Sequence, residues 1–230
     1  RIVSAESGLK DNAIPASARA VLAVEPAKLP AVQTRVSGLE AAFRAEHTVS
    51  DPGLTLTVRS GNPAPSALTE AAGKTVVQFL QLVPNGIVSM SMDIPGLVQT
   101  SSNLGIFHVA DGLLVARASV RSSVASEKEM LLERFATLCA LLGASMEITG
   151  NYPAWEYKRD SALRDTMVRV FTEQYGHAPK IEAIHAGLEC GLFSGKLPGL
   201  DCVSFGPDLL EIHTPREKMS IPSVQRTWKL

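Results

Sequence analysis

Hydrophobic residues recur along this chain with two periods, one typical of helices and one typical of strands. Between residues 29 and 47, apolar side chains stand at i, i+4, i+7 and i+11, which predicts an amphipathic helix with one buried face. That stripe consists of Val32, Val36, Leu39 and Phe43. Comparable stripes predict helices over residues 127–142 and 162–175, and a further helix is expected over 66–83, where Pro84-Asn85-Gly86 ends it. A short helix is expected at 189–193, and a last helix begins near Ser220 with Trp228 facing inward.

Alternating or β-branched runs between these helices predict strands. The runs are residues 1–4, 17–24, 54–58, 87–92, 98–107, 113–122, 145–149, 180–184 and 200–205. Asp111-Gly112 predicts a tight hairpin between two of them, because these residues tolerate positive φ. Other local signals mark helix ends: a capping box at Ser126 and Glu129, a cap at Asp160 or Ser161, and glycines at 143 and 176.

The order of these elements predicts two regions. Residues 1–150 have the order of an α+β open-faced sandwich, a ferredoxin-like arrangement with one inserted helix and strand. Gly150–Pro153 marks a change of composition and a predicted domain boundary. Residues 151–230 follow with an α/β pattern of strand, turn, helix, strand and loop, in which polar groups after strand ends are the usual binding groups.

Composition narrows the classes of function. The chain has 230 residues, 45% of them hydrophobic, which is enough for one large or two modest cores. A net charge of -1 predicts no nucleic acid and no anionic membrane as partner. The apolar runs are too short to span a bilayer. Cys139, Cys190 and Cys202 have no CxxC spacing, which favours free thiols in a reducing compartment.

The first residue is Arg1 rather than Met, and residues 1–3 already have the pattern of a strand. No signal peptide is visible at this end of the sequence. We therefore expect the chain to be part of a larger protein.

Four ordered blocks of the sequence resemble one enzyme family, the Xaa-His (aminoacyl-histidine) dipeptidases. The blocks are GLKDNAIP at 8–15, DIPGLV at 93–98, VRSS at 120–123, and HAGLECGLFSGKLPGLDCVSFGP at 185–207 with IHTPREK at 212–218. The resemblance implies a cytoplasmic dinuclear zinc peptidase, similar to carnosinase, that hydrolyses small dipeptides. It also implies that residues 1–150 form a lid domain, which pairs two copies into a homodimer, and that 151–230 belong to the catalytic domain.

One metal ligand is expected in this chain. A catalytic zinc needs imidazole or carboxylate ligands and an open position for water. His213 lies in a loop, where an arbitrary histidine is rarely a ligand, but the resemblance implies that it binds one of two zinc ions. Ile212 and Arg216 depart from the family pattern beside it.

Four further residues are candidates for substrate binding. Asn12 has a turn role by default, and the resemblance implies that it reaches the substrate from the lid. Arg121 is either an ordinary edge charge or a two-pronged clamp for the substrate's carboxylate. Glu189 is either a solvated acid at a helix start or a contact for the substrate's ammonium group. Gly187 would allow close backbone approach, and His185 is expected to be a packed turn residue.

The other elements of a dinuclear site, a His-x-Asp and a Glu-Glu pair, do not occur in the sequence. We therefore expect this chain to be inactive alone. A rival hypothesis is a non-catalytic dimerisation or binding module derived from the lid domain. A third is a related tripeptidase or acylase, which would differ in substrate only.

Overall fold

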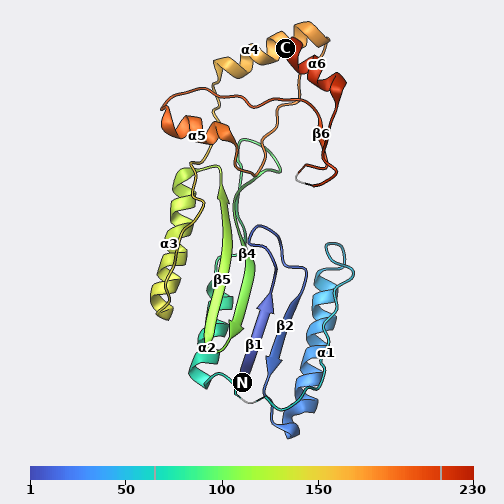
Figure 1. Cartoon of the computed structure of the whole chain (residues 1–230), viewed down its shortest axis with the longest axis vertical. Coiled ribbons are helices and arrows are strands. Elements are labelled where there is room, and N and C mark those ends of the chain that lie inside the picture. Colours follow the sequence, from blue (N-terminus) through green and yellow to red (C-terminus); the bar gives the residue numbers. More distant parts are fainter. Residues whose placement is uncertain (65, 213) are drawn as a thin grey trace. The chain divides into compact units, whose positions relative to one another are not determined.

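The structure, a computed structural model, describes residues 1–64, 66–212 and 214–230. They form two compact units, each described by itself below. The first consists of residues 1–83 and 103–119, and the second of residues 84–102 and 120–230 (Figure 1). The long strands β4 (Val98–Ala110) and β5 (Leu113–Ser122) contribute residues to both.

An antiparallel sheet is the main element of the fold. Its strand order is β2-β1-β4-β3, and β5 also pairs with β4. The remaining strands are β1 (Ile2–Ser7), β2 (Ala18–Leu22) and β3 (Gly86–Met90). Asp111 and Gly112 connect β4 to β5 with φ of 52° and 78°, so the predicted hairpin is confirmed. The chain is thus a mixed α/β protein with an antiparallel sheet.

The first unit buries its apolar core between this sheet and one helix. Val76 of α2 (Glu70–Leu82) packs with Phe107 and Val109 of β4, and none of these three side chains is more than 5% exposed. Phe79, one turn further along α2, stacks on Phe107 with ring centroids 6.1 Å apart. Figure 1 shows α2 behind the strands. Helices η1 (Pro26–Lys28) and α1 (Leu29–Glu46) complete this unit.

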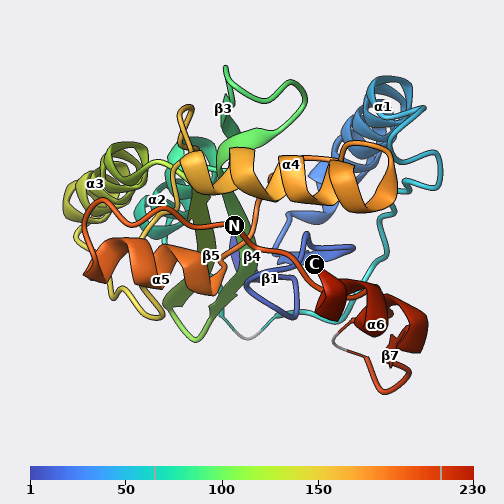
Figure 2. The ribbon, with the colours of Figure 1, turned by 90° about the horizontal axis from the view of Figure 1, so that it is seen from above.

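Helices dominate the second unit. They are α3 (Ala125–Leu142), α4 (Ala162–Tyr175), α5 (Glu189–Lys196) and α6 (Ile221–Lys229). A two-stranded ladder pairs β6 (Leu209–Leu210) with β7 (Lys218–Met219). Long stretches of irregular chain connect α4 to α5 and α5 to the β6–β7 ladder that precedes α6 (Figure 2). The predicted helix ends at Gly143 and Gly176 are confirmed, since both glycines are left-handed C-caps.

Four predicted strands are wrong. Residues 54–58, 145–149, 180–184 and 200–205 are not strands in the structure. A strand requires hydrogen bonds to a neighbouring strand, which an alternating pattern does not supply by itself. The Leu56 N–H donates instead to the Glu40 carboxylate of α1, at 3.2 Å.

Three details of the helices also differ from the predictions. Helix α3 begins at Ala125 without the Ser126 box, because Glu156 accepts the Ala125 N–H at 3.1 Å and supplies the cap from outside the helix. The stripe of α1 is at most half-buried, with Phe43 38% exposed. Trp228 of α6 is 90% exposed rather than inward, since no described residue covers that face.

The division into a lid over residues 1–150 and a catalytic segment over 151–230 stays a prediction. The two compact units separate within residues 83–120, and residues 150 and 151 both lie in the second unit. In the described part of the chain, none of the helices is both long enough and apolar enough to cross a membrane.

Candidate functional site

The candidate site in the second unit is the turn before α5. Residues of β4 and β5 make hydrogen bonds to His185, the first residue of this turn. The Arg121 guanidinium of β5 donates to the His185 carbonyl oxygen at 3.1 Å. The Ser101 hydroxyl of β4 lies 2.7 Å from His185 Nε2. One bond fixes the backbone and the other fixes the ring, so the two strands determine the position of this turn. Sequence reasoning predicted a packed turn histidine, and these contacts agree.

The surroundings of His185 also affect its charge state. Burial, and then the positive charge of Arg121, lower the pKa of this imidazole below its ordinary value. The ring is therefore neutral at neutral pH. A neutral ring can exchange a hydrogen bond with the Ser101 hydroxyl in either direction.

Gly187 and Glu189 continue from this turn into α5. A Cβ on Gly187 would lie 2.4 Å from the Tyr152 ring, so the glycine allows the aromatic ring to lie against the backbone. Glu189 is the first residue of α5, and its side chain is exposed. An acidic side chain is favourable next to a helix N-terminus, so Glu189 could have this structural role alone, without contacting a substrate. Arg121, Gly187 and Glu189 therefore belong to one continuous feature of the second unit.

Asn12 belongs to the first unit and is described separately. It is exposed at the tip of a turn whose carbonyl oxygens, those of Asp11 and Ala13, each accept from the Asn103 amide at 2.9 Å. A Cβ on Gly105 would lie 2.2 Å from the Asp11 oxygen, so β4 needs a glycine under this turn. The chain thus presents Asn12 outward from a fixed turn.

Sequence reasoning missed a carboxylate that joins α3 to the sheet. Glu127 accepts from Ser89 at 2.5 Å, from Gln99 at 2.7 Å, and from the fully buried Thr100. The hydrogen bonds from Ser89 and Thr100 lower the pKa of this carboxyl. Only the pairing of β3 with β4 brings these donors together, so no local pattern could have indicated them.

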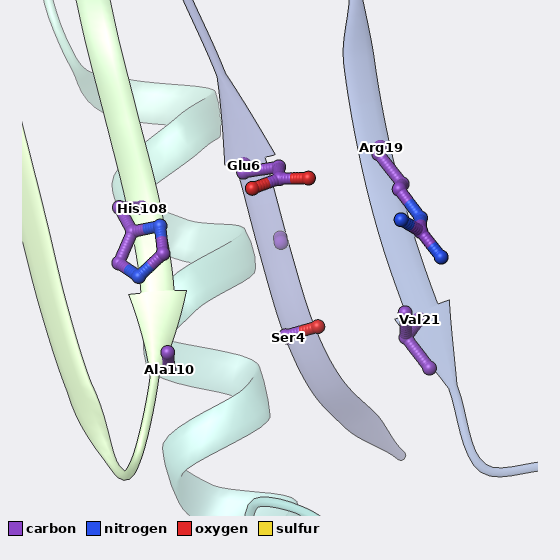
Figure 3. Close-up of a pocket in the computed structure, with 7 residues that line it drawn as sticks. Ser4, Glu6, Arg19, Val21, His108 and Ala110 are labelled. Atoms are coloured by element: carbon purple, nitrogen blue, oxygen red, sulfur yellow. The ribbon is translucent and has the colours of Figure 1, made fainter.

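A separate hollow of about 310 Å³ lies on the first unit's sheet (Figure 3). Glu6 of β1 stands opposite Arg19 of β2 and opposite His108 of β4, which places the three side chains in one row across the strands. All three are exposed. The row is on the face opposite the one that packs Ala5 and Val109 against α2. It contains none of the predicted site residues.

The residues that the structure describes do not form a metal centre. No group of three or more histidine, cysteine, aspartate or glutamate side chains among them could hold an ion. The predicted zinc ligand, His213, lies outside the described residues. The described side chains therefore do not fit a zinc site by themselves.

Comparison with known proteins points to peptide hydrolases. No family model matches the chain. The cytosol non-specific dipeptidase of Escherichia coli (strain K12) is 31% identical over all 230 residues. The crystal structure of aminoacylhistidine dipeptidase from Vibrio alginolyticus superposes on the whole chain with a TM-score of 0.93 and 29% identity. The chain spans about half the length of both relatives, 47% of each.

Sequence and structure thus agree that the chain is homologous to dipeptidases. The resemblance to the aminoacyl-histidine dipeptidases, stated above from four blocks of sequence, is confirmed along the whole chain.

Proposed function

We propose that this chain is part of a metallo-dipeptidase that hydrolyses Xaa-His and related dipeptides. The observation that carries the proposal is similarity over every residue of the chain to two dipeptidases, one by sequence and one by structure. Similarity of sequence as well as fold over the whole chain supports this proposal better than a shared fold alone would, because one fold can host many functions. We infer a cytoplasmic location from the name of the Escherichia coli relative.

In this proposal, Arg121 binds the carboxylate of the dipeptide. A guanidinium carries five N–H donors, and the His185 carbonyl uses one of them. The remaining donors can grip a carboxylate with two parallel hydrogen bonds. His185 is neutral and held by Ser101, so it adds no charge that would compete with Arg121 for the carboxylate.

Two further residues complete the proposed contacts from the second unit. Gly187 would offer its backbone groups to the peptide, and the Tyr152 ring, which fills the space a side chain would take there, would lie beside that contact. The exposed Glu189 carboxylate would pair with the ammonium group of the substrate. Asn12 would add an amide from the lid.

Zinc is the metal that we propose for the whole enzyme, as two ions that supply a Lewis acid and an activated water. His213 would hold one of them. The other ligands would come from the part of the relatives' length that this chain does not span. The 230-residue chain alone is accordingly proposed to be inactive.

The alternative, a dimerisation module, has one observation in its favour. Strand β2 stands at the end of the sheet order, and among the described residues it pairs with β1 alone, so the other side of its backbone could pair with a second copy. Such pairing is compatible with the enzyme, since a lid can both dimerise and bind substrate. A monomer at micromolar concentration by sedimentation equilibrium would remove this alternative.

The test is hydrolysis of glycyl-histidine and of its C-terminal amide by the protein that contains this chain. Arg121→Ala should lower kcat/KM on the free peptide by on the order of 10²–10³-fold, the usual effect of removing one partner of a desolvated charge pair. The amide, which lacks the carboxylate, should be affected far less. Arg121→Lys keeps the positive charge but cannot donate two parallel hydrogen bonds, so it should restore only part of the kcat/KM lost in Arg121→Ala.

Arg159→Ala is the matched control, because this exposed arginine pairs with Asp93, which is not one of the candidate residues. It should leave both rates unchanged. A protein that cleaves no dipeptide would contradict the proposed function. Equal losses of kcat/KM on the peptide and on the amide would contradict only the proposed role of Arg121, and would leave the proposed function standing.

A further inference from the structure

Helix α5 carries a cysteine whose thiol has a second cysteine as neighbour. Cys190 and Ser194 stand one turn apart on α5 and therefore share a face of the helix. The Ser194 hydroxyl lies 3.7 Å from Cys202 Sγ, which places Cys202 against that face. The thiols of Cys190 and Cys202 also influence each other: burial, and next the Cys202 thiol, raise the pKa of Cys190.

The fold fixes both partners of this pair. Asp201, next to Cys202, accepts from the Ser161 hydroxyl at 2.8 Å and from the Leu163 N–H at 3.1 Å, so this part of the chain is tied to the start of α4. On the other side, a Cβ on Gly191 would lie 3.0 Å from the Pro153 oxygen, and one on Gly195 2.6 Å from the Pro153 ring. Helix α5 is therefore held in place while Cys202 is held against it.

We propose that Cys190 and Cys202 form a reversible dithiol–disulfide site, oxidised by a low-molecular-weight disulfide such as oxidised glutathione. A disulfide needs Cβ atoms about 3.5–4.5 Å apart, and the fold favours this approach by holding Cys202 against the helix face that carries Cys190. The bond would fasten α5 to the segment that follows it. Cys139, on α3, takes no part.

The reaction balances in two exchange steps. One protein thiol loses its proton, attacks the small disulfide, and releases one small thiolate, which takes up a proton. The second protein thiol loses its proton and attacks the mixed disulfide, which forms the Cys190–Cys202 bond and releases a second small thiol. Two protein thiols are oxidised and one small disulfide is reduced. Because the thiolate is the nucleophile and Cys190 has a raised pKa, the overall rate should increase with pH.

The test is equilibration of the 230-residue chain in glutathione redox buffers, with acid quenching and mapping of disulfides by peptide mass spectrometry. The native chain should form the Cys190–Cys202 bond. Its effective thiol concentration should exceed, by about tenfold or more, the value in denaturant, where only a flexible loop joins the two residues. Adding reduced glutathione should restore both thiols.

Three variants sharpen the result. Cys190→Ser and Cys202→Ser should each stop at a mixed disulfide with glutathione, whereas Cys139→Ser should behave like the native chain. Separate glutathione adducts on Cys190 and Cys202, a crosslink to Cys139, or equal effective concentrations in native and denatured chains would each overturn the proposal. The denaturant comparison uses the unmodified chain, so it does not depend on the folding of any variant.

Discussion

Residues 1–150, called here the sheet region because they contain the five-stranded sheet, and residues 151–230 are stabilised by different kinds of interaction. All six buried hydrophobic side chains among the described residues lie before residue 139: Val76, Val83, Phe107, Val109, Leu131 and Leu138. Among the described residues of 151–230, the buried polar side chains are Ser161, the N-cap of α4, and Ser223, whose N–H donates to the N-cap Ser220 of α6. Phe193, Phe205 and Trp228 are more than half exposed. The first region has an apolar core, and the second depends mainly on polar contacts. Under the proposed function, the rest of the enzyme would cover these exposed side chains.

The largest expected effect contrasts one apolar residue from each region. Leu131 is 0% exposed, so Leu131→Ala should lower the free energy of unfolding by about 2–5 kcal/mol. Phe193 is 55% exposed, so Phe193→Ala should cost far less than the 3–5 kcal/mol usual for a buried phenylalanine. Urea denaturation measures both. A Phe193→Ala variant as unstable as Leu131→Ala would contradict the comparison.

The second effect concerns the polar network inside the sheet region. Glu127→Ala removes a carboxylate with three hydrogen-bond donors and should cost roughly 1–3 kcal/mol. Its folded pKa is lowered, so the carboxylate's contribution is present above its unfolded pKa of about 4.3 and is lost as pH falls through the folded pKa.

Urea unfolding of the native chain and of Glu127→Gln, from about pH 7 to about pH 3, checks this pH dependence. The variant should show a shallower decline in acid. Glu129→Gln is the matched control, an exposed acid on the same helix. Parallel curves for all three proteins would show that the Glu127 network does not contribute to the pH dependence.

The third effect concerns the polar contacts of residues 151–230. The Ser161 hydroxyl accepts the Arg164 N–H at 3.1 Å and donates to Asp201. Ser161→Ala should cost about 1 kcal/mol, the usual cost of losing a helix cap. Hydrogen exchange should locate the loss at the start of α4. Ser161→Asp, which can still cap but faces Asp201, should not rescue it.

The smallest effect is a shift in a single titration. Burial and Arg121 lower the pKa of His185, so the neutral ring's contribution to stability is present above about pH 6.5 and is lost as pH falls below it. Arg121→Ala should raise the pKa of His185, as followed by the NMR signal of its ring. Arg159→Ala should leave that titration unchanged. A fall in the pKa after Arg121→Ala would contradict the electrostatic assignment.

Local patterns predicted helices better than strands. The stripes and glycines around α3 and α4 contain most of the information that a helix needs, because its hydrogen bonds stay within one segment. The run at 145–149 has the same alternating pattern as β5, but only β5 has a strand to pair with. Pairing is a property of the whole fold, so the sequence pattern alone could not separate these two runs.

In the candidate site, too, the sequence indicated some residues, whereas the contacts between them appear only in the structure. Sequence blocks drew attention to Arg121 and Gly187, because their types and neighbours resemble a family. The contacts of Ser101 and Arg121 with His185 join residues more than sixty positions apart, and only the structure brings them together. The Glu127 network and the pairing of Cys190 with Cys202 depend on tertiary contacts of the same kind.

The most direct test of the account is zinc-dependent cleavage of glycyl-histidine, measured together with intact mass. We predict metal-dependent turnover by the protein that contains this chain, and no turnover by the 24.5 kDa chain of residues 1–230 with added zinc. Metal-independent cleavage by the larger protein, or turnover at 24.5 kDa, would contradict the proposed two-zinc mechanism.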